Sequence, residues 1–560
     1  MNSALVYFKN KFTLSDDIVE KKRKPIDILF NFGCFLLLFV FIYLSYTIVK
    51  PMNMQYGTID GMMAKAYGAI LFSILAISYV VLKIKHKTNL EINILYLLLL
   101  GFIIKLVYML YTTGYTRQHD TWTGDFHNGH YDYAKFIFDN WSLPNHIFTE
   151  SEIYQFYHPP LYYFVSAIWM KIYSVFGFNA ELISSSENLF ISSQVLTTFF
   201  TFLTTYYAVK TIRLVAKTKA SLYVGVVFVC FFPRLIQFSG QINNDAFATL
   251  LVVCSVYRLF KYAFDKKSFK NICLCGLYLG LAMNTKLSAV IVCLGFAFYF
   301  IYLFIKTVEK KENQLTTGRL ILQYLCFLLI AASIGLWFQV YAHNVYGIPY
   351  NFVFRALNSE LFTGPRSYVL SHHYLSVEYY DTYNSGAIYT NGFVNFLARF
   401  VLPFWPADFE ESFIFADAFE NYNILTYAIK SSIFGEFPYW GGEGFGFIGI
   451  ISGYIGWFLL IGITIYNFVK KRCDMAMIVS AAIAISVIIF YLYLQITMPY
   501  GCSMDARYIV PIIVPLAILS MKNIEFLPEK GRINNLLKYS LGFSVVIFAI
   551  AGGLFYCFAI

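Results

Sequence analysis

Apolar stretches of about 18 to 25 residues recur along this 560-residue chain, and each is long enough to cross the roughly 30 Å hydrocarbon core of a bilayer as a helix. Only 13% of the residues are charged, which is about half the share of an ordinary soluble domain, and the mean hydropathy is +0.59. These features exclude a water-soluble fold. We expect an all-α polytopic membrane protein.

The apolar runs and the charges beside them predict where helices cross the membrane. Thirteen spans are expected, near residues 27–49, 67–83, 91–111, 188–209, 220–237, 245–262, 270–284, 287–305, 321–343, 446–469, 474–496, 507–520 and 538–558. The segment 160–177 is also apolar. We interpret it as an interfacial helix, because a crossing there would place Lys210 and Arg213 on the outer face.

Basic residues predict the orientation of the chain. Of the 42 Lys and Arg residues, 29 lie in seven short segments, at 1–26, 83–88, 210–219, 258–270, 306–319, 470–472 and 522–538. Lys and Arg are enriched in cytoplasmic loops, so these segments should be cytoplasmic. The amino terminus is then cytoplasmic and the carboxyl terminus external. Abundant Phe, Tyr, Ile, Asn and Lys are typical of an AT-rich genome and favour a bacterial plasma membrane, with the endoplasmic reticulum as the alternative.

Two long connections, 112–187 and 344–445, fall on the outer face under this topology. Loops of this length are more often functional than idle, because short turns suffice to join helices. We therefore expect one integral membrane domain over 1–560, with a cytoplasmic amino-terminal segment at 1–26, a first external catalytic loop at 112–187 and a second external loop at 344–445. Most of the ten cysteines lie in apolar runs, so neither a disulfide framework nor a zinc site is indicated.

The first external loop is dense in residues that can carry chemistry. Asp120 follows a predicted span, and a carboxylate at this depth can act as a base. The alternative for Asp120 is a solvated carboxylate or a helix cap. For His119, and for His127 and His130, the alternative is a structural, hydrogen-bonded histidine. For His158-Pro159-Pro160 the alternative is a helix start, because proline fits the first turn of a helix.

Several motifs of this chain resemble those of the GT-C glycosyltransferases, and the most similar branch contains protein O-mannosyltransferases and aminoarabinose transferases. In the first loop they are His119-Asp120, Gly129-His130-Tyr131, Leu143-Pro144 and Gln155-Phe156-Tyr157-His158-Pro159-Pro160-Leu161-Tyr162-Tyr163. Later motifs are Gly240-Gln241-Ile242-Asn243-Asn244-Asp245, Asn284-Thr285-Lys286-Leu287-Ser288 and Asp505-Ala506-Arg507-Tyr508-Ile509-Val510-Pro511. The resemblance covers roughly residues 90 to 520.

This resemblance implies a GT-C fold and an inverting transfer of a sugar from a polyprenyl-phosphate carrier to an acceptor at the external membrane face. The acceptor would be a glycan, a lipid or a protein. Two features depart from the family. Two apparent extra spans precede the first loop, and His119-Asp120 stands where relatives often show Asp-Glu.

The chemistry of such a transfer selects candidate residues. An acceptor hydroxyl must lose a proton, and Asp120, with His119, is the expected catalytic pair. Negative charge grows on the leaving lipid phosphate, so cations at the outer face would lower the barrier, and the candidates are Lys286, Arg507 and Arg234. Lys286 is alternatively a snorkelling side chain, and Arg507 an ion-pair partner of Asp505 that only fixes a helix start. For Arg234 a structural role is favoured.

Further residues are expected to bind substrate. They are Asp125, His130, Tyr157, His158, Asn244 and Asp245, although Asn244 and Asp245 are also typical of a helix start. Aromatic side chains here stack on sugars or form an interfacial belt. The second loop offers possible acceptor-binding residues without a ranking, namely His343, His372, His373, Glu378, Glu436 and Glu443. Neither loop contains an Asp-x-Asp motif, so we expect metal-independent transfer and no cofactor.

Two other function classes fit thirteen spans. A transporter or flippase of a lipid-linked saccharide is the main alternative, but transporters concentrate ionisable groups near the bilayer midplane and often show paired halves. Here the unusual residues cluster in external loops. A non-catalytic assembly subunit would fit if the loop residues were dispensable.

Overall fold

The computed structural model describes most of the chain between residues 25 and 559. The described residues are 25–55, 61–122, 129–145, 156–177, 183–311, 315–347, 350, 424–435, 437, 439, 441–497, 505–529 and 531–559. The predicted candidates Asp125, His127, His372, His373, Glu378 and Glu436 lie outside these ranges.

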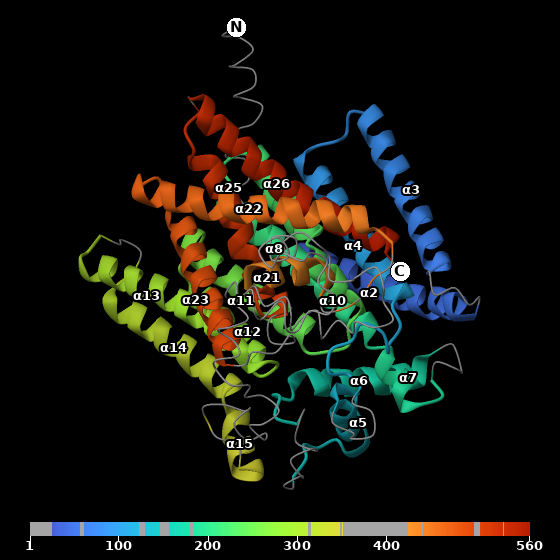
Figure 1. Ribbon diagram of the computed structural model, residues 1–560. Helices are drawn as coiled ribbons and strands as arrows, with labels where there is room; N and C mark the ends of the chain where they lie inside the picture. Colours follow the sequence, from blue (N-terminus) through green and yellow to red (C-terminus); the bar gives the residue numbers. More distant parts are fainter. Residues whose placement is uncertain are drawn as a thin grey trace, which may run out of the picture.

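The regular elements in these ranges are helices (Figure 1). The first half contains α2 (Pro25–Gln55), α3 (Met62–Ile84), α4 (Leu90–Tyr111), α5 (His130–Asn140), α6 (Leu161–Phe176), α7 (Ser186–Ile191), α8 (Gln194–Val215), α9 (Lys219–Cys230), α10 (Pro233–Gly240), α11 (Asp245–Phe264) and α12 (Phe269–Met283). The second half contains η3 (Leu287–Ile291), α13 (Val292–Val308), α14 (Thr317–Gly335), α15 (Trp337–Tyr346), α21 (Ile424–Phe434), α22 (Glu443–Val469), α23 (Met475–Thr497), η4 (Ala506–Tyr508), η5 (Val510–Ile512), α25 (Ile513–Phe526) and α26 (Arg532–Phe558).

Ten helical segments of the described residues are long and apolar enough to cross a membrane, and the predicted all-α membrane fold is confirmed. They are Gly33–Met52, Met62–Ile84, Leu90–Tyr111, Lys219–Gly240, Asp245–Phe264, Leu287–Val308, Thr317–Tyr346, Glu443–Val469, Met475–Leu494 and Arg532–Phe558.

The predicted count of thirteen spans is not confirmed, since three predicted spans are absent from these ten. The span expected at 188–209 is interrupted between α7 and α8, and α8 is rich in threonine, which lowers its hydropathy. Helices α12 and α25, with 15 and 14 residues, are too short to cross about 30 Å alone. The span expected at 507–520 begins with two short 3₁₀ turns, η4 and η5, before α25.

Hydroxyl side chains begin three helices next to the basic segments. Thr218, Ser268 and Thr316 precede α9, α12 and α14, and each side-chain oxygen accepts a hydrogen bond from the backbone N–H three residues later. These caps satisfy N–H groups that have no partner within the helix.

A proline break positions helix α10 in the centre of the molecule. Helix α9 ends at Cys230, and Pro233 occupies the first turn of α10, where its missing N–H costs nothing. Every residue of α10 is buried, including Arg234. The break therefore holds a cation inside the protein rather than in the hydrocarbon.

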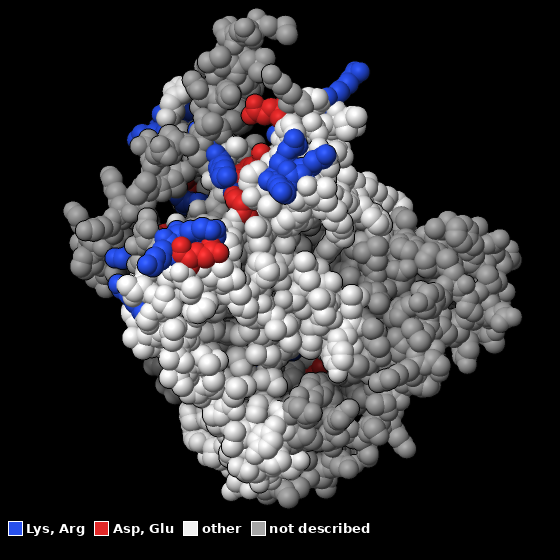
Figure 2. All heavy atoms as spheres, turned by 90° about the vertical axis from the view of Figure 1, so that its left-hand side faces the viewer, with Lys and Arg blue, Asp and Glu red and all other residues white. Residues whose placement is uncertain are grey.

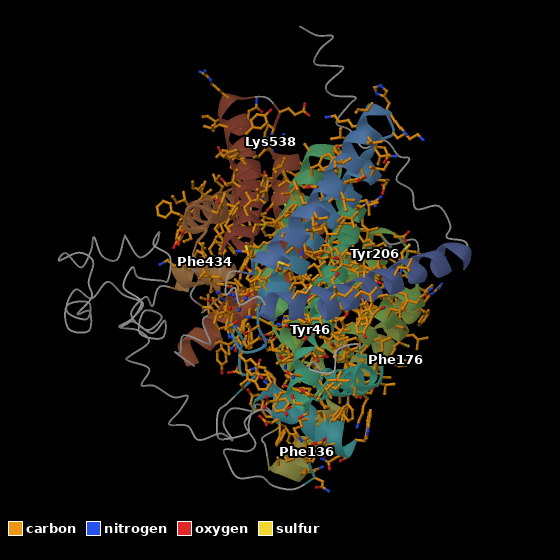
Figure 3. All side chains as sticks on the ribbon, turned by 90° about the vertical axis from the view of Figure 1, so that its right-hand side faces the viewer. Tyr46, Phe136, Phe176, Tyr206, Phe434 and Lys538 are labelled. Atoms are coloured by element: carbon orange, nitrogen blue, oxygen red, sulfur yellow. The ribbon has the colours of Figure 1, made fainter. Side chains whose placement is uncertain are left out.

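Segments predicted to lie on opposite membrane faces lie at opposite ends of the molecule. Helices α5, α6 and α7 lie together at the end that also holds α15 (Figure 1). Lys538 of a predicted cytoplasmic segment lies at one end and Phe136 of the first external loop at the other (Figure 3). Figure 2 shows one face of the molecule. On this face Lys and Arg gather in the half nearer the end that carries Lys538. The orientation in the membrane and the interfacial position of 160–177 stay predictions.

Candidate functional site

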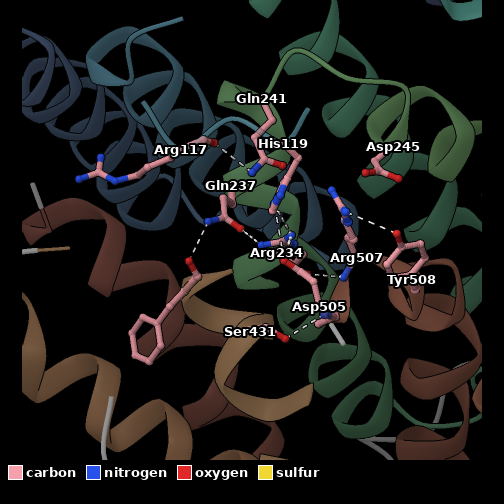
Figure 4. A network of polar contacts seen from close by, with 12 residues as sticks. Arg117, His119, Arg234, Gln237, Gln241, Asp245, Ser431, Asp505, Arg507 and Tyr508 are labelled. Atoms are coloured by element: carbon pink, nitrogen blue, oxygen red, sulfur yellow. Dashed lines mark hydrogen bonds and ion pairs between the residues drawn. The ribbon is translucent and has the colours of Figure 1, made fainter. Parts of the chain in front are cut away.

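The loop that follows α4 is fixed to the corner between α10 and α11 by glutamine side chains. Gln118 donates from Nε2 to the carbonyl of Gly240 at 2.9 Å, and its Oε1 accepts from the N–H of Ile242 at 2.8 Å. Gln241 donates back to the carbonyl of Arg117 at 3.2 Å (Figure 4). These reciprocal bonds hold the backbone on both sides of the contact, so the next residues of the loop have a fixed place.

Asp120 lies two residues beyond Gln118, and its carboxylate is open to approach. Its φ is +53°, in the left-handed region that Asp tolerates better than most residues. The carbonyl of Asp120 accepts from the N–H of His130 at 2.8 Å, and the side chain is 42% exposed. The distance from Asp120 Oδ2 to Arg507 Nη2 is 3.8 Å. The structure thus brings the predicted base beside a predicted phosphate cation from 387 residues later in the chain.

Arg507 is held by the start of η4. Asp505 Oδ1 accepts from the N–H of Arg507 at 2.7 Å, as in a helix cap. The guanidinium carbon of Arg507 lies 5.2 Å from the ring centre of Tyr508. Asp505 therefore fixes this turn through the backbone, whereas the guanidinium of Arg507 reaches towards Asp120.

A buried cluster connects the first loop to Asp505, the residue before η4 (Figure 4). Arg234 and Asp505 have 0% exposed side chains, and Arg234 Nη2 donates to Asp505 Oδ2 at 2.6 Å. The same nitrogen contacts His119 Nε2 at 3.1 Å, and Arg234 also donates to Gln237. This cluster joins three parts of the chain, namely the loop after α4, helix α10 and the start of η4.

Arg234 and His119 both lie inside this buried cluster. Arg234 has no exposed surface and its charge is paired with Asp505, so it has no access to a donor phosphate without rearrangement. Because an arginine N–H can only donate, His119 Nε2 accepts, which fixes a neutral ring. Burial, and then the cation of Arg507, hold the pKa of His119 well below its usual range. Asp120 has the exposed carboxylate, and the catalytic role of His119 and the phosphate role of Arg234 stay predictions.

Lys286 and Arg507 line the same cavity. Its lining combines polar and charged side chains with apolar ones from several helices, namely Asp245, Thr249, Val252, Lys286, Ser288, Ile291, Val292, Val487, Phe490, Arg507, Tyr508 and Pro511 among others. Lys286 forms an ion pair with Asp245, and its Nζ lies 4.8 Å from the ring centre of Tyr508. Burial lowers the pKa of Lys286, and Asp245 opposes that effect.

The connection between α12 and η3 is tied to the rest of the site by backbone contacts. Asn244 donates from Nδ2 to the carbonyl of Thr285 at 3.3 Å. The N–H of Leu161, at the start of α6, donates to the carbonyl of Asn284 at 3.0 Å. The start of α6, within the first loop, is therefore bonded to the segment that carries Lys286. Asn244 is buried at the residue before α11, but its side chain makes no capping hydrogen bond to that helix.

Two histidines form an aromatic cluster beside Asp120. The His130 and His158 rings stack with centres 5.6 Å apart, and His130 Nδ1 lies 2.7 Å from the Tyr163 hydroxyl. Tyr157 packs on His158 with ring centres 4.2 Å apart. Burial lowers the pKa of His130 to about 4 and that of His158 well below its usual range. Both rings are therefore neutral at pH 7.

This burial predicts acid sensitivity. His130 binds a proton near pH 6.5 in the unfolded chain but only near pH 4 in the folded protein. The contribution of the neutral His130 to the free energy of unfolding is therefore fully present above about pH 6.5 and is lost as the pH decreases towards 4. The loss from this residue is on the order of 3 kcal/mol. We expect His130→Gln to lose less stability between pH 7.5 and 5 than the unchanged protein in thermal unfolding. An equal acid-induced loss in both would contradict this account, and His86→Gln, in the exposed α3–α4 turn, is the control.

Two candidates of the second loop have local partners. The His343 ring stacks on Tyr350 with centres 3.9 Å apart, and Glu443 accepts from the N–H of Gly441 at 2.7 Å. Neither residue lines the cavity that holds Lys286. Acceptor binding by the second loop stays a prediction.

Gln118, Gln241 and Tyr508 shape the site but were given no role from the sequence, which predicted Asp505 only as an ion-pair partner of Arg507. Gln241, Asp505 and Tyr508 lie inside the quoted motifs, and Gln118 directly precedes His119, so their signal was their position beside the residues selected for chemistry. For the metal question, the described ranges hold no group of three or more His, Cys, Asp or Glu side chains that could bind an ion. Metal independence stays a prediction.

Part of the chain is similar to a known protein family. Residues 157–337 match the family model of dolichyl-phosphate-mannose-protein mannosyltransferases. The matched segment contains Lys286, Arg234 and His158 but neither Asp120 nor Arg507. The match confirms, over about a third of the chain, the resemblance drawn from the motifs. A search of the curated proteins finds no match.

Two solved structures are similar to this chain. The apo oligosaccharyltransferase of Archaeoglobus fulgidus is 13% identical with a TM-score of 0.44, over 83% of this chain and 56% of that chain. ArnT from Cupriavidus metallidurans, bound to undecaprenyl phosphate, is 13% identical with a TM-score of 0.42, over 83% of this chain and 75% of that chain. The chain thus spans little more than half of the archaeal protein.

Proposed function

We propose that this membrane glycosyltransferase of the GT-C superfamily transfers a sugar from a polyprenyl-phosphate donor to an acceptor hydroxyl at the external membrane face. One observation carries the proposal. A half-exposed carboxylate, Asp120, lies 3.8 Å from Arg507, and Arg507 shares a cavity with Lys286. A general base and two cations for a leaving phosphate thus meet in one place.

The two halves of the reaction need these groups. Asp120 takes the proton of the acceptor hydroxyl as its oxygen attacks the anomeric carbon. The bond from that carbon to the phosphate oxygen breaks on the opposite side, which inverts the configuration, and the carrier phosphate leaves with added negative charge. Lys286 and Arg507 stabilise this charge, and their effect is strong because both side chains are largely buried.

The remaining site residues fit a sugar subsite. His130 is bonded to the carbonyl of Asp120 through its backbone, and its ring stacks on His158. Tyr157 extends this aromatic cluster. Ring faces and ring nitrogens of this kind bind pyranose faces and hydroxyls. We assign His130, Tyr157 and His158 to sugar binding, and the ion pair of Asp245 with Lys286 to orienting that lysine for the phosphate.

The location of the reaction follows from the charge distribution. We place the amino terminus in the cytoplasm and the carboxyl terminus outside, in a bacterial plasma membrane, with the site on the external face. The separation of Lys538 from Phe136 at opposite ends of the molecule supports this orientation (Figure 3). The partners are a lipid-linked sugar donor and a glycan, lipid or protein acceptor.

The proposal is tested by sugar transfer from a defined donor. Undecaprenyl-phosphate mannose with a labelled sugar is offered to the purified protein in proteoliposomes. Membranes from cells that naturally make this protein supply the acceptors. We expect label to enter acceptor material and undecaprenyl phosphate to be released in equal amount. If labelled donor crosses the bilayer without any product, the protein is a transporter instead.

Carrier binding gives a separate prediction. We expect Lys286→Met and Arg507→Met each to weaken binding of undecaprenyl phosphate by about 10- to 100-fold, because each removes a charge-assisted contact. Binding is measured by native mass spectrometry of the detergent-solubilised protein. Lys538→Met, at the opposite end of the molecule, is the control and should bind normally. Unchanged affinity in both site variants would remove the phosphate role.

A further inference from the structure

Lys50 is a buried charge in a helix that the motif resemblance does not cover. It lies in α2, before residue 90, and only 1% of its surface is exposed. Its Nζ donates to the carbonyl of Met109 at 3.0 Å and of Thr112 at 2.8 Å, and it also donates to Gln194. All three N–H groups of the ammonium therefore have oxygen partners.

These partners place the charge at the carboxyl end of α4. The last four carbonyls of a helix have no partner within it, and that end carries partial negative charge. Met109 lies in the last turn of α4, and Thr112 is the next residue after the helix. An ammonium at this point both pairs the carbonyls and opposes the dipole. Lys50 thus fixes the point from which the first external loop departs.

Gln194 continues the contact towards Asp120. Its Nε2 donates to the carbonyl of Thr112 at 3.2 Å and to that of Gly240 at 2.6 Å. The same Gly240 carbonyl accepts from Gln118, two residues before Asp120. Lys50 therefore supports both ends of the short segment 112–118.

We infer that Lys50 is a positioning residue, which acts through Thr112, Gln194 and Gln118 to hold the Asp120 carboxylate beside Arg507. The inference rests on the proposed function, because it concerns the same base. It also gives α2, one of the two apparent extra spans of this chain, a role in catalysis. The contacts of Lys50 do not reach the cavity that holds Lys286, so carrier binding should be independent of it.

A matched control exists at the other end of the protein. Lys522 is also 1% exposed, and its Nζ donates to the carbonyl of Val215, the last residue of α8, at 2.5 Å. It is paired with Glu525 at 2.9 Å in a predicted cytoplasmic segment. Lys50→Met and Lys522→Met therefore both remove a buried ammonium from a helix end, and only the first removes support from the Asp120 loop.

Hydrogen exchange followed by mass spectrometry tests the structural step without a substrate. We expect Lys50→Met to speed exchange of the backbone amides of 112–122, whereas Lys522→Met leaves that segment unchanged. If Lys50→Met does not fold, Lys50→Gln, which keeps one donor, is compared in the same way. Equal exchange of 112–122 in the Lys50 and Lys522 variants would overturn the inference.

Kinetics test the catalytic step with undecaprenyl-phosphate mannose as donor. We expect Lys50→Met to lower kcat by about 10- to 100-fold with an unchanged KM for the donor, because a shift of about 1 Å in a reacting group has an effect of this size. Lys50→Arg should restore part of the rate, and Lys522→Met should keep the normal kcat per folded molecule.

In an Asp120→Asn background, Lys50→Met should have no further effect. A further loss there, or a changed KM alone, would overturn the inference, whereas activity of Asp120→Asn itself would overturn the proposed function.

Discussion

Asp120→Asn is expected to lower kcat for sugar transfer by about 10²- to 10⁴-fold, the range that a positioned general base contributes. Asparagine has the shape of aspartate but cannot take a proton from the acceptor hydroxyl. The Asp120 side chain is half-exposed and its backbone conformation is one that asparagine also tolerates, so the variant should fold normally. Binding of undecaprenyl phosphate should be nearly unchanged, because Lys286 and Arg507 remain.

The control for this variant is a carboxylate of the same loop with no place in the site. Asp139 on α5 is exposed and forms an ion pair with Lys135 one turn away. Asp139→Asn should keep full activity, since exposed pairs of this kind contribute little. Labelled product is measured in proteoliposomes for both variants at saturating donor. Full turnover by Asp120→Asn would show that another group takes the proton. The position of Asp120 beside Arg507 would then no longer support the proposed function.

The helices of this fold were largely predictable, because their signal is local. Runs of about 20 apolar residues and flanking charges predicted most of the spans within several residues. The predicted spans that are not confirmed correspond to α8, α12 and α25, where many residues are buried against other helices. Helix α25 is only 14 residues long and almost wholly buried, so its apolar character reflects protein packing and not a full crossing. Length and hydropathy do not separate these two environments.

The site was predictable only as a set of parts. The motifs selected Asp120, Lys286 and Arg507, and the structure brings these three together. The same reasoning also selected Arg234, because sequence depth alone does not show whether a cation lines a cavity or neutralises a buried acid. That distinction depends on Asp505, which lies 271 residues away in the chain. A contact of this range leaves no local pattern, and the same is true of Lys50 and Met109.

The paired burial of Arg234 and Asp505 gives the second large effect. We expect Arg234→Met to lower the free energy of unfolding by about 3–5 kcal/mol, because it leaves Asp505 charged, buried and without its cation. The measurement is thermal unfolding of the purified protein in detergent, with Lys135→Met, which breaks an exposed pair, as the control. The control should change stability by less than about 1 kcal/mol.

A double variant separates this role from the phosphate contact that the sequence predicted for Arg234. Replacing Asp505 by Asn together with Arg234→Met removes the uncompensated charge, so we expect it to recover part of the lost stability, as coupled neighbours do. If Arg234 instead contacts the carrier, Arg234→Met should weaken undecaprenyl phosphate binding while its unfolding temperature stays near that of the control. The two roles therefore predict opposite results in the same pair of measurements. The complete burial of both side chains favours the loss of stability.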